Sequence, residues 1–198
     1  MAESLLFMPL TLRGLTISNR IMLAPMNQHA ASDGLADDFQ LVHLGKFALG
    51  GFGLVMTGAT AIERDARIGP GDLGIWSDDH VPGFKRVCDF LHSVGAAAGI
   101  QLSHCGRKGA SQRPWQGFGP LDEENARDGE GPWPLVSPTT EALGEGYVVP
   151  RKISRSEITE VVESFARAAI RADKAGFDVV EIHGGHGYLI ASFLTPQI

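Results

Sequence analysis

Four short apolar runs, separated by helical patterns that end in glycine, constrain the fold of this chain more than any other feature. The runs lie at residues 21–25, 52–57, 97–102 and 179–182. Continuous apolar runs of this length are typical of parallel strands that are buried on both faces. Three strand–helix pairs followed by a fourth strand predict an α/β fold with a parallel sheet and right-handed crossovers.

The segments between these runs predict three helices. The first begins at the acidic pair of residues 37–38, and the second begins near Asp79, with Pro82 in its first turn. The third is the best defined, because Ser154 and Glu157 have the spacing of a capping box. Its apolar stripe is predicted to comprise Ile158, Val161, Val162, Phe165, Ala169 and Ala172. Glycines at the far ends predict where the three helices stop.

Two other segments are expected to flank the sheet. Residues 5–18 read as a small hairpin, which in a barrel could cover the N-terminal mouth. Residues 103–150 are too long for an ordinary loop between strand and helix. Because this stretch carries Trp115, Phe118 and Trp133 with several prolines, we interpret it as an ordered active-site insertion; the alternative is a flexible surface loop.

Charge and composition exclude several classes of function. The 198-residue chain has a net charge of −6, and its 17 basic residues do not cluster, which argues against a nucleic-acid partner. No apolar stretch approaches the roughly 20 residues of a membrane span, and no signal peptide is visible. Cys88 and Cys105 form neither a disulfide framework nor a zinc pattern. We therefore expect a cytoplasmic protein that acts on a small molecule.

Residues able to contact a ligand follow every predicted strand, at the edge where parallel α/β folds bind ligands. In chain order they are Pro25, Met26, Asn27, Gln28 and His29, then Ala59, then Gln101 and His104, and finally His183, His186 and Tyr188. The last group surrounds three glycines at a strand end. Two histidines and a tyrosine in such a place are suited to polarising a carbonyl and transferring a proton.

Five motifs occur together in register: residues 24–26, 72–77, 101–108, 113–115 and 183–188. With them the whole chain resembles the old yellow enzyme family of NADH:flavin oxidoreductases, in particular its bacterial branch of xenobiotic reductases. The resemblance implies the N-terminal half of a (β/α)₈ TIM barrel, with strands one to four, an N-terminal hairpin and a long loop after the third strand. The chain would then be one incomplete FMN-binding domain over residues 1–198.

The resemblance also implies roles for individual residues. FMN would be contacted by Pro25, Met26, Asn27, Ala59, Gln101 and His183, with the Gln101 amide at the pyrimidine edge of the flavin. Substrate would be contacted by His29, Lys108, His183 and His186. The two histidines at the fourth strand would donate hydrogen bonds to a substrate carbonyl, and Tyr188 would deliver a proton after hydride transfer from the flavin. Arg107 would lie near the rim, and NAD(P)H would be the reductant.

Some residues depart from the family pattern. Asn27 stands where many relatives of this branch have cysteine or threonine, so a thiol effect on the flavin potential is not expected. His29 stands where a substrate-contacting tyrosine is common, which leaves the substrate preference open. The pair Gly184–Gly185 replaces a common Ala–Ala, and we expect no consequence from that change.

Structural roles are the alternative for several of these residues. Gln101 could merely cap its strand, Lys108 could be a solvated loop cation, and Tyr188 could be a packed aromatic residue. His104 could hold the third loop, and Cys105 is expected to be inert.

The leading function is reduction of an activated C=C bond of an enone-type substrate with FMN and NAD(P)H. Within the family, a dienoyl-CoA reductase or an amine dehydrogenase remains open. From other classes, His104, His183 and His186 could bind zinc in a hydrolytic barrel, although no carboxylate completes that site in sequence; a metal is not expected. A non-catalytic fragment is the third alternative.

A complete (β/α)₈ barrel needs about 250 residues. Four strands would leave open sheet edges, so we expect this chain alone to bind FMN weakly or not at all. A homo-oligomer is expected for the full-length protein.

Overall fold

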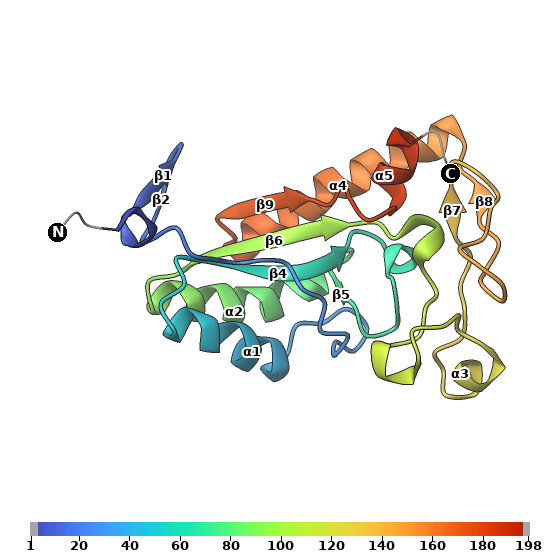
Figure 1. Ribbon diagram of the computed structural model, residues 1–198, viewed down its shortest axis with the longest axis horizontal. Coiled ribbons are helices and arrows are strands. Elements are labelled where there is room, and N and C mark those ends of the chain that lie inside the picture. Colours follow the sequence, from blue (N-terminus) through green and yellow to red (C-terminus); the bar gives the residue numbers. More distant parts are fainter. Residues whose placement is uncertain (1–3, 196–198) are drawn as a thin grey trace.

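A parallel sheet forms the centre of the computed structural model, which describes residues 4–195 (Figure 1). Its strand order is β3-β4-β6-β9, and a short fifth strand, β5, pairs with β4. The strands are β3 Met22–Leu23, β4 Leu54–Ala61, β5 Leu73–Gly74, β6 Ala97–Ser103 and β9 Val179–Ile182. The predicted strands and their parallel pairing are confirmed. The second strand continues beyond its predicted end, and β5 was not predicted.

Three long helices follow the strands and pack against the sheet. They are α1 Asp38–Leu49, α2 Val81–Ser93 and α4 Arg155–Ala175. In Figure 1, α1 and α2 lie side by side below β4 and β6, and α4 runs behind β9. One apolar core joins these layers, with Leu44 from α1, Phe84 from α2, Ala168 from α4 and Ile100 from β6. The alternation of strand and helix predicted from the sequence is therefore confirmed.

The ends of α4 follow from its capping residues. Ser154 Oγ accepts from the backbone N–H of Glu157 at 3.3 Å, and Glu157 Oε2 accepts from the backbone N–H of Ser154 at 2.8 Å. Gly176 ends the helix at φ +95°, a conformation that glycine adopts without strain. The predicted stripe is wrong at Val162, which is 61% exposed. Val161, Phe165 and Ala169 of that stripe pack against the core, and Ala172 is buried as predicted. The other buried positions are Ser164, Ala168 and Ala175, small residues that let the helix approach its neighbours closely.

Burial differs strongly across the sheet. Every residue of β4 is buried, and β6 is buried at all positions except Gln101. In β9, half-buried and exposed positions alternate, and Val180 and Ile182 are exposed. The central strands are therefore covered on both faces, whereas β9 has one face open to solvent.

A hairpin precedes the sheet, as predicted. It consists of β1 Leu10–Leu12 and β2 Leu15–Ile17, after a 3₁₀ turn at Leu5–Phe7. Figure 1 shows it beyond the N-terminal ends of β4 and β6, far from the ends where these strands point. Ile17 packs there against Leu54 and Met56, forming a small separate core.

The long segment after β6 is ordered, which supports the insertion and not the flexible loop. It contains 3₁₀ turns at Gly106–Lys108 and Pro114–Gln116, helix α3 Glu123–Arg127 and strand β7 Val136–Ser137. Strand β8 Arg151–Lys152 pairs with β7. The buried apolar residues of this insertion are Cys105, Ala110, Leu121 and Leu135, which pack with Ile68 and Ala59.

A last helix, α5 Leu189–Leu194, follows β9 and was not predicted. Within residues 4–195, no helix is both long enough and apolar enough to cross a membrane.

Candidate functional site

A cavity of about 160 Å³ opens at the C-terminal ends of the strands. It is lined by Pro25, Asn27, His29, Ala59, Ile68, Gln101, Phe118, His183, His186 and Tyr188. We call it the strand-end cavity. It brings together all the residues with a predicted flavin or substrate contact except Met26 and Lys108. Gln28 and His104, also considered as ligand contacts, lie outside its lining. Ile68 and Phe118 had no predicted site role, because neither lies directly after a strand of the central sheet.

The two histidines after β9 contact each other, and their bonds define their tautomers. The backbone N–H of Gly185 donates to His183 Nδ1 at 3.1 Å, so the proton of the neutral His183 ring is on Nε2. That Nε2 lies 3.3 Å from His186 Nδ1, which must accept. The proton of His186 is therefore on its Nε2, which can donate to a ligand.

Burial also favours the neutral form of His183. Desolvation lowers its pKa, and the neighbouring His186 lowers it further. In this arrangement His183 donates to His186, so the prediction that both rings bind one carbonyl oxygen requires the rings to rotate apart.

Tyr188 completes one wall of the cavity, the β9 wall, which consists of His183, His186 and Tyr188. Its ring lies edge-on to His183, with ring centroids 4.8 Å apart. Burial raises its pKa to about 12, helped by the nearby Asp72 and Cys105. The phenol therefore keeps its proton at neutral pH and can donate it.

Lys108 supports this wall from outside the cavity. Its Nζ donates to the backbone carbonyl of His186 at 2.7 Å. His186 has φ +56°, in the left-handed region that is costly for a side chain other than glycine. The contact with Lys108 helps to hold that turn, which is a positioning role; a direct contact of Lys108 with substrate stays a prediction.

Gln101 and Ala59 come from the two central strands, where they pair across β4 and β6. Gln101 Nε2 donates to Glu181 Oε1 at 2.5 Å, which leaves its amide oxygen unclaimed by that bond. The pairing shifts between Met56 and Ala59, and this irregularity brings Ala59 to the cavity. At Gly58, a Cβ would come within 2.6 Å of the Met26 carbonyl oxygen, so the strand must have glycine there.

Asn27 and His29 form the opposite wall, and both contact Asp72. Asn27 Nδ2 donates to Asp72 Oδ1 at 3.2 Å, and His29 Nδ1 lies 3.1 Å from the same oxygen. The other carboxylate oxygen accepts from the backbone N–H groups of Ile68 and Gly69, at 2.6 and 3.3 Å. Sequence reasoning recognised Asp72 only as the first residue of a motif and gave it no role.

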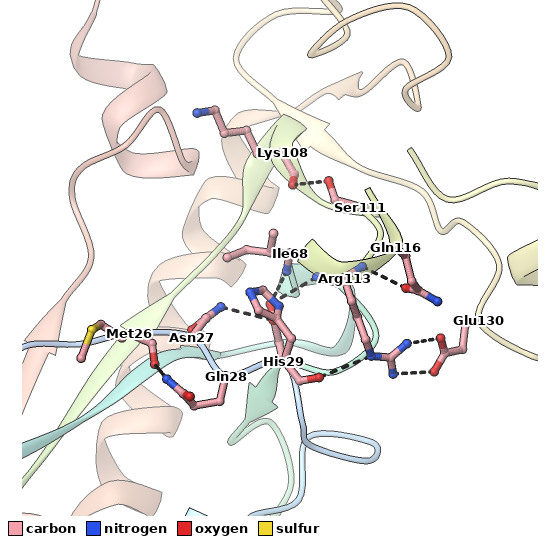
Figure 2. A network of polar contacts seen from close by, with 12 residues as sticks. Met26, Asn27, Gln28, His29, Ile68, Lys108, Ser111, Arg113, Gln116 and Glu130 are labelled. Atoms are coloured by element: carbon pink, nitrogen blue, oxygen red, sulfur yellow. Dashed lines mark hydrogen bonds and ion pairs between the residues drawn. The ribbon is translucent and has the colours of Figure 1, made fainter. Parts of the chain in front are cut away.

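Met26 and Arg107 lie apart from the strand-end cavity. The Met26 side chain is half-exposed and lines a neighbouring cavity of about 20 Å³, and its carbonyl accepts from Gln28 Nε2 at 3.0 Å (Figure 2). Arg107 lies 3.7 Å from Glu141. Neither side chain belongs to the lining of the strand-end cavity.

His104 is a buried histidine that lines another cavity, of about 190 Å³, together with Glu63. Its Nδ1 accepts from the backbone N–H of Gly106, and burial lowers its pKa to about 4. It is thus separated from His183 and His186, and the three histidines considered for zinc are not brought together. Across residues 4–195, no group of three or more potential metal ligands converges. Burial also raises the pKa of the Cys105 thiol.

Comparison with known proteins gives the family. Residues 5–198 match the model of the NADH:flavin oxidoreductase / NADH oxidase family. An NADH:flavin oxidoreductase of Gibberella zeae is 42% identical over 96% of this chain and 46% of its own length. An NADPH dehydrogenase of Listeria welshimeri is 42% identical over 98% of this chain and 52% of its own length.

Solved structures agree with the fold. Morphinone reductase matches with a TM-score of 0.80 at 29% identity, over 96% of this chain and 50% of that chain. Old Yellow Enzyme from Pichia sp. matches with a TM-score of 0.82 over 98% of this chain and 50% of that chain; at 24% identity it supports the fold alone. These neighbours are TIM barrels, which confirms the predicted half-barrel architecture.

The chain spans about half the length of the relatives that it matches. Both the family model and the relatives nevertheless cover nearly all of it. The chain therefore belongs to the NADH:flavin oxidoreductase family, the family of the old yellow enzymes.

Proposed function

We propose that this chain supplies flavin-facing and carbonyl-binding residues of an FMN-dependent oxidoreductase that uses NAD(P)H to reduce the activated C=C bond of an enone-type substrate. The observation that carries the proposal is the strand-end cavity, which joins the Gln101 amide to the cluster of His183, His186 and Tyr188. Bound FMN would supply the two-electron chemistry, taking a hydride from the nicotinamide and passing it to the substrate.

The residues that line the cavity fit a flat heteroaromatic group. Pro25, Ala59 and Ile68 offer apolar surface, while Gln101 and Asn27 offer amide groups at the edge. The Gln101 oxygen is not used by its bond to Glu181 and can accept from a ring N–H. Close backbone approach at Gly58 keeps the first two strand ends near each other. We therefore assign the flavin contacts to Pro25, Asn27, Ala59 and Gln101, with Met26 contributing only through its backbone.

The residues after β9 would act on the substrate. His186 Nε2 donates to the carbonyl oxygen, where negative charge develops as the hydride arrives at the β-carbon. A preorganised donor of this kind contributes about 3 kcal/mol to lowering a barrier. His183 orients His186 through their shared hydrogen bond, and Tyr188 holds the proton that the α-carbon takes up.

We also propose a cellular location and an oligomeric state for the full-length protein. Because relatives are about twice as long, the binding of the flavin phosphate is assigned to no residue here. We propose a cytoplasmic enzyme that works as a homo-oligomer in its full-length form. A dienoyl-CoA reductase or amine dehydrogenase activity has no separate observation in its favour.

NMR titration of the ¹⁵N-labelled chain with FMN tests the flavin contacts, since it detects weak binding. We expect the largest shifts at the backbone amides of Ala59 and Gln101, and none around His104. Gln101→Ala should weaken the response, whereas Gln116→Ala, on the insertion, should not. A response confined to residues away from Ala59 and Gln101 would disprove the flavin assignment.

Oxidation of NADPH coupled to reduction of cyclohexenone, with FMN supplied, tests the reaction. His186→Ala should lower kcat/KM about 100-fold, the usual effect of losing one such donor. His43→Ala is the matched control, because His43 lies on α1 and stacks on Phe39. An unchanged kcat/KM in the His186 variant would remove His186 from the mechanism.

A further inference from the structure

We propose that Asp72 is a positioning residue that makes His29 a hydrogen-bond acceptor in the strand-end cavity, so that the preferred substrate carries a hydroxyl or N–H donor in addition to its activating carbonyl. This inference rests on the proposed function for the identity of the substrate. Its structural part, the state of His29, can be tested without flavin.

The Asp72 carboxylate is buried and contacted by donors on both oxygens. One oxygen accepts from the backbone N–H groups of Ile68 and Gly69, which cannot change their role. The other accepts from Asn27 Nδ2 and faces His29 Nδ1. The Asp72 side chain is only 2% exposed. Because these partners present protons to it, the carboxylate is an acceptor in every contact.

This carboxylate selects one tautomer of His29. A ring nitrogen 3.1 Å from a carboxylate oxygen must carry the proton, because two lone pairs would otherwise repel each other. The contact is close but lacks aligned hydrogen-bond geometry, which leaves Nδ1 buried and imperfectly satisfied. The neutral ring then has its lone pair on Nε2. Within residues 4–195 the polar contact of this ring with Asp72 is made through Nδ1, which leaves Nε2 for a ligand.

The backbone of His29 is held as firmly as its ring. His29 has φ +52°, an unfavourable region for a residue with a Cβ. Its carbonyl accepts from Arg113 Nε at 3.3 Å, and Arg113 is itself held by a bidentate pair with Glu130 (Figure 2). On the other side, a Cβ on Gly71 would lie 2.1 Å from the same carbonyl oxygen.

These contacts fix the His29 ring in the cavity into which His186 and Tyr188 of the β9 wall present their donors. The His29 side chain is only 9% exposed, and Phe118 from the insertion lies edge-on at 6.3 Å between ring centroids. His186 offers an N–H to the same cavity, whereas His29 offers a lone pair. A substrate that satisfies both therefore needs an acceptor at one position and a donor at another. A plain enone would leave the His29 nitrogen without a partner, which is costly in a buried site.

Long-range ¹H–¹⁵N NMR of the histidine rings tests the tautomer directly in the purified chain. We expect the His29 signals, assigned with His29→Gln, to show a protonated Nδ1 and an unprotonated Nε2. The variant Asp72→Asn should reverse this pattern. Its amide oxygen must stay toward the Ile68 and Gly69 N–H groups, which turns the NH₂ group toward His29 and forces Nδ1 to accept.

Asp89→Asn is the control, because Asp89 pairs with Lys85 on the exposed face of α2. It should leave the His29 signals unchanged. The wild-type spectrum is decisive even if Asp72→Asn does not fold. An Nε2-protonated ring or an imidazolium in the wild type at neutral pH would overturn the inference.

Kinetics with matched substrates test the preference. Among cyclohexenones that carry hydrogen, a hydroxyl or a carboxylate on the ring, we expect kcat/KM to be about 10-fold higher for a hydroxyl compound, the value of one hydrogen bond of about 1.4 kcal/mol. Asp72→Asn should remove this advantage through KM. Equal values, or a preference for the carboxylate, would overturn the substrate assignment. The tautomer of His29 does not depend on FMN. If FMN shifts only residues away from Ala59 and Gln101, the proposed function fails while the tautomer result remains valid.

Discussion

The two walls of the strand-end cavity are held in opposite ways. The β9 wall is organised locally: His183, His186 and Tyr188 contact each other and the backbone of Gly185 within a few residues of sequence. The wall after β3 is organised at long range, because Asn27 and His29 depend on Asp72 and Arg113. A local wall can be recognised from a short motif. The wall after β3, called here the distant wall, can be disrupted by substitutions far away in the sequence, which a short motif does not identify.

The largest expected effect comes from removing the centre of the distant wall. Asp72→Ala leaves the N–H groups of Ile68 and Gly69 without an acceptor and releases Asn27 and His29. We expect a loss of about 4 kcal/mol in the free energy of unfolding, from several buried groups each costing about 1–3 kcal/mol. Urea denaturation measures it.

Glu181→Ala is the matched change on the local wall. Glu181 is only partly buried and has one hydrogen bond, from Gln101. Its loss should cost under about 1 kcal/mol. Equal losses for the two variants would contradict the contrast between the walls.

A pH titration probes the support behind the β9 wall. The backbone N–H of Leu189, which follows Tyr188, donates to the carbonyl of His104 at 3.0 Å. Burial lowers the pKa of His104 to about 4, so below its unfolded pKa of 6.5 only the unfolded chain takes up this proton. Stability should be full above pH 6.5 and fall by about 3 kcal/mol as the pH drops toward 4.

Denaturation at a series of pH values measures this loss. His104→Gln should flatten the dependence over that range, while His92→Gln, on the exposed side of α2, should retain it. A His104 variant with an unchanged pH profile would assign the acid sensitivity to other groups.

One glycine substitution in each wall gives the last comparison, and the smallest expected effect is that of Gly184→Ala. Gly71→Ala would force a Cβ against the His29 carbonyl oxygen and should cost about 2 kcal/mol. Gly184→Ala meets only Ile190 Cγ2, at 3.8 Å, and should change stability by less than about 0.5 kcal/mol. Thermal unfolding of both variants would compare the walls directly. A destabilisation confined to Gly184→Ala would reverse the comparison.

The sequence predicted those parts of the fold that depend on local periodicity and capping. The apolar runs predicted strands β3, β4, β6 and β9, and the Ser154–Glu157 spacing predicted the start of α4. It misplaced Val162, because the stripe of a helix packed closely on its neighbours is made of small residues as well as large ones. It missed β5, since two residues carry no periodic signal and pair only because β4 extends to Ala61.

The candidate site shows the same division. Parallel topology is enough to predict that residues after successive strands meet, and most of the predicted set lines one cavity. Whether Met26 and Lys108 face that cavity depends on backbone turns that the sequence does not encode locally. The partnership of Asp72 with His29 joins residues far apart in the chain, so only the fold could reveal it.

The hairpin at the opposite end of the sheet has a practical consequence. Gln101 lies four residues beyond the start of β6 at Ala97, so this part of the strand spans about 13 Å, and the β1–β2 hairpin lies beyond that end of the sheet (Figure 1). No other atom comes within 4 Å of a Cβ built on Gly14, and Cys88 and Cys105 are both buried. A Gly14→Cys variant would therefore accept a thiol-reactive dye or a surface tether at a single position, and immobilised or fluorescent protein could be prepared with the opening of the cavity facing free solution.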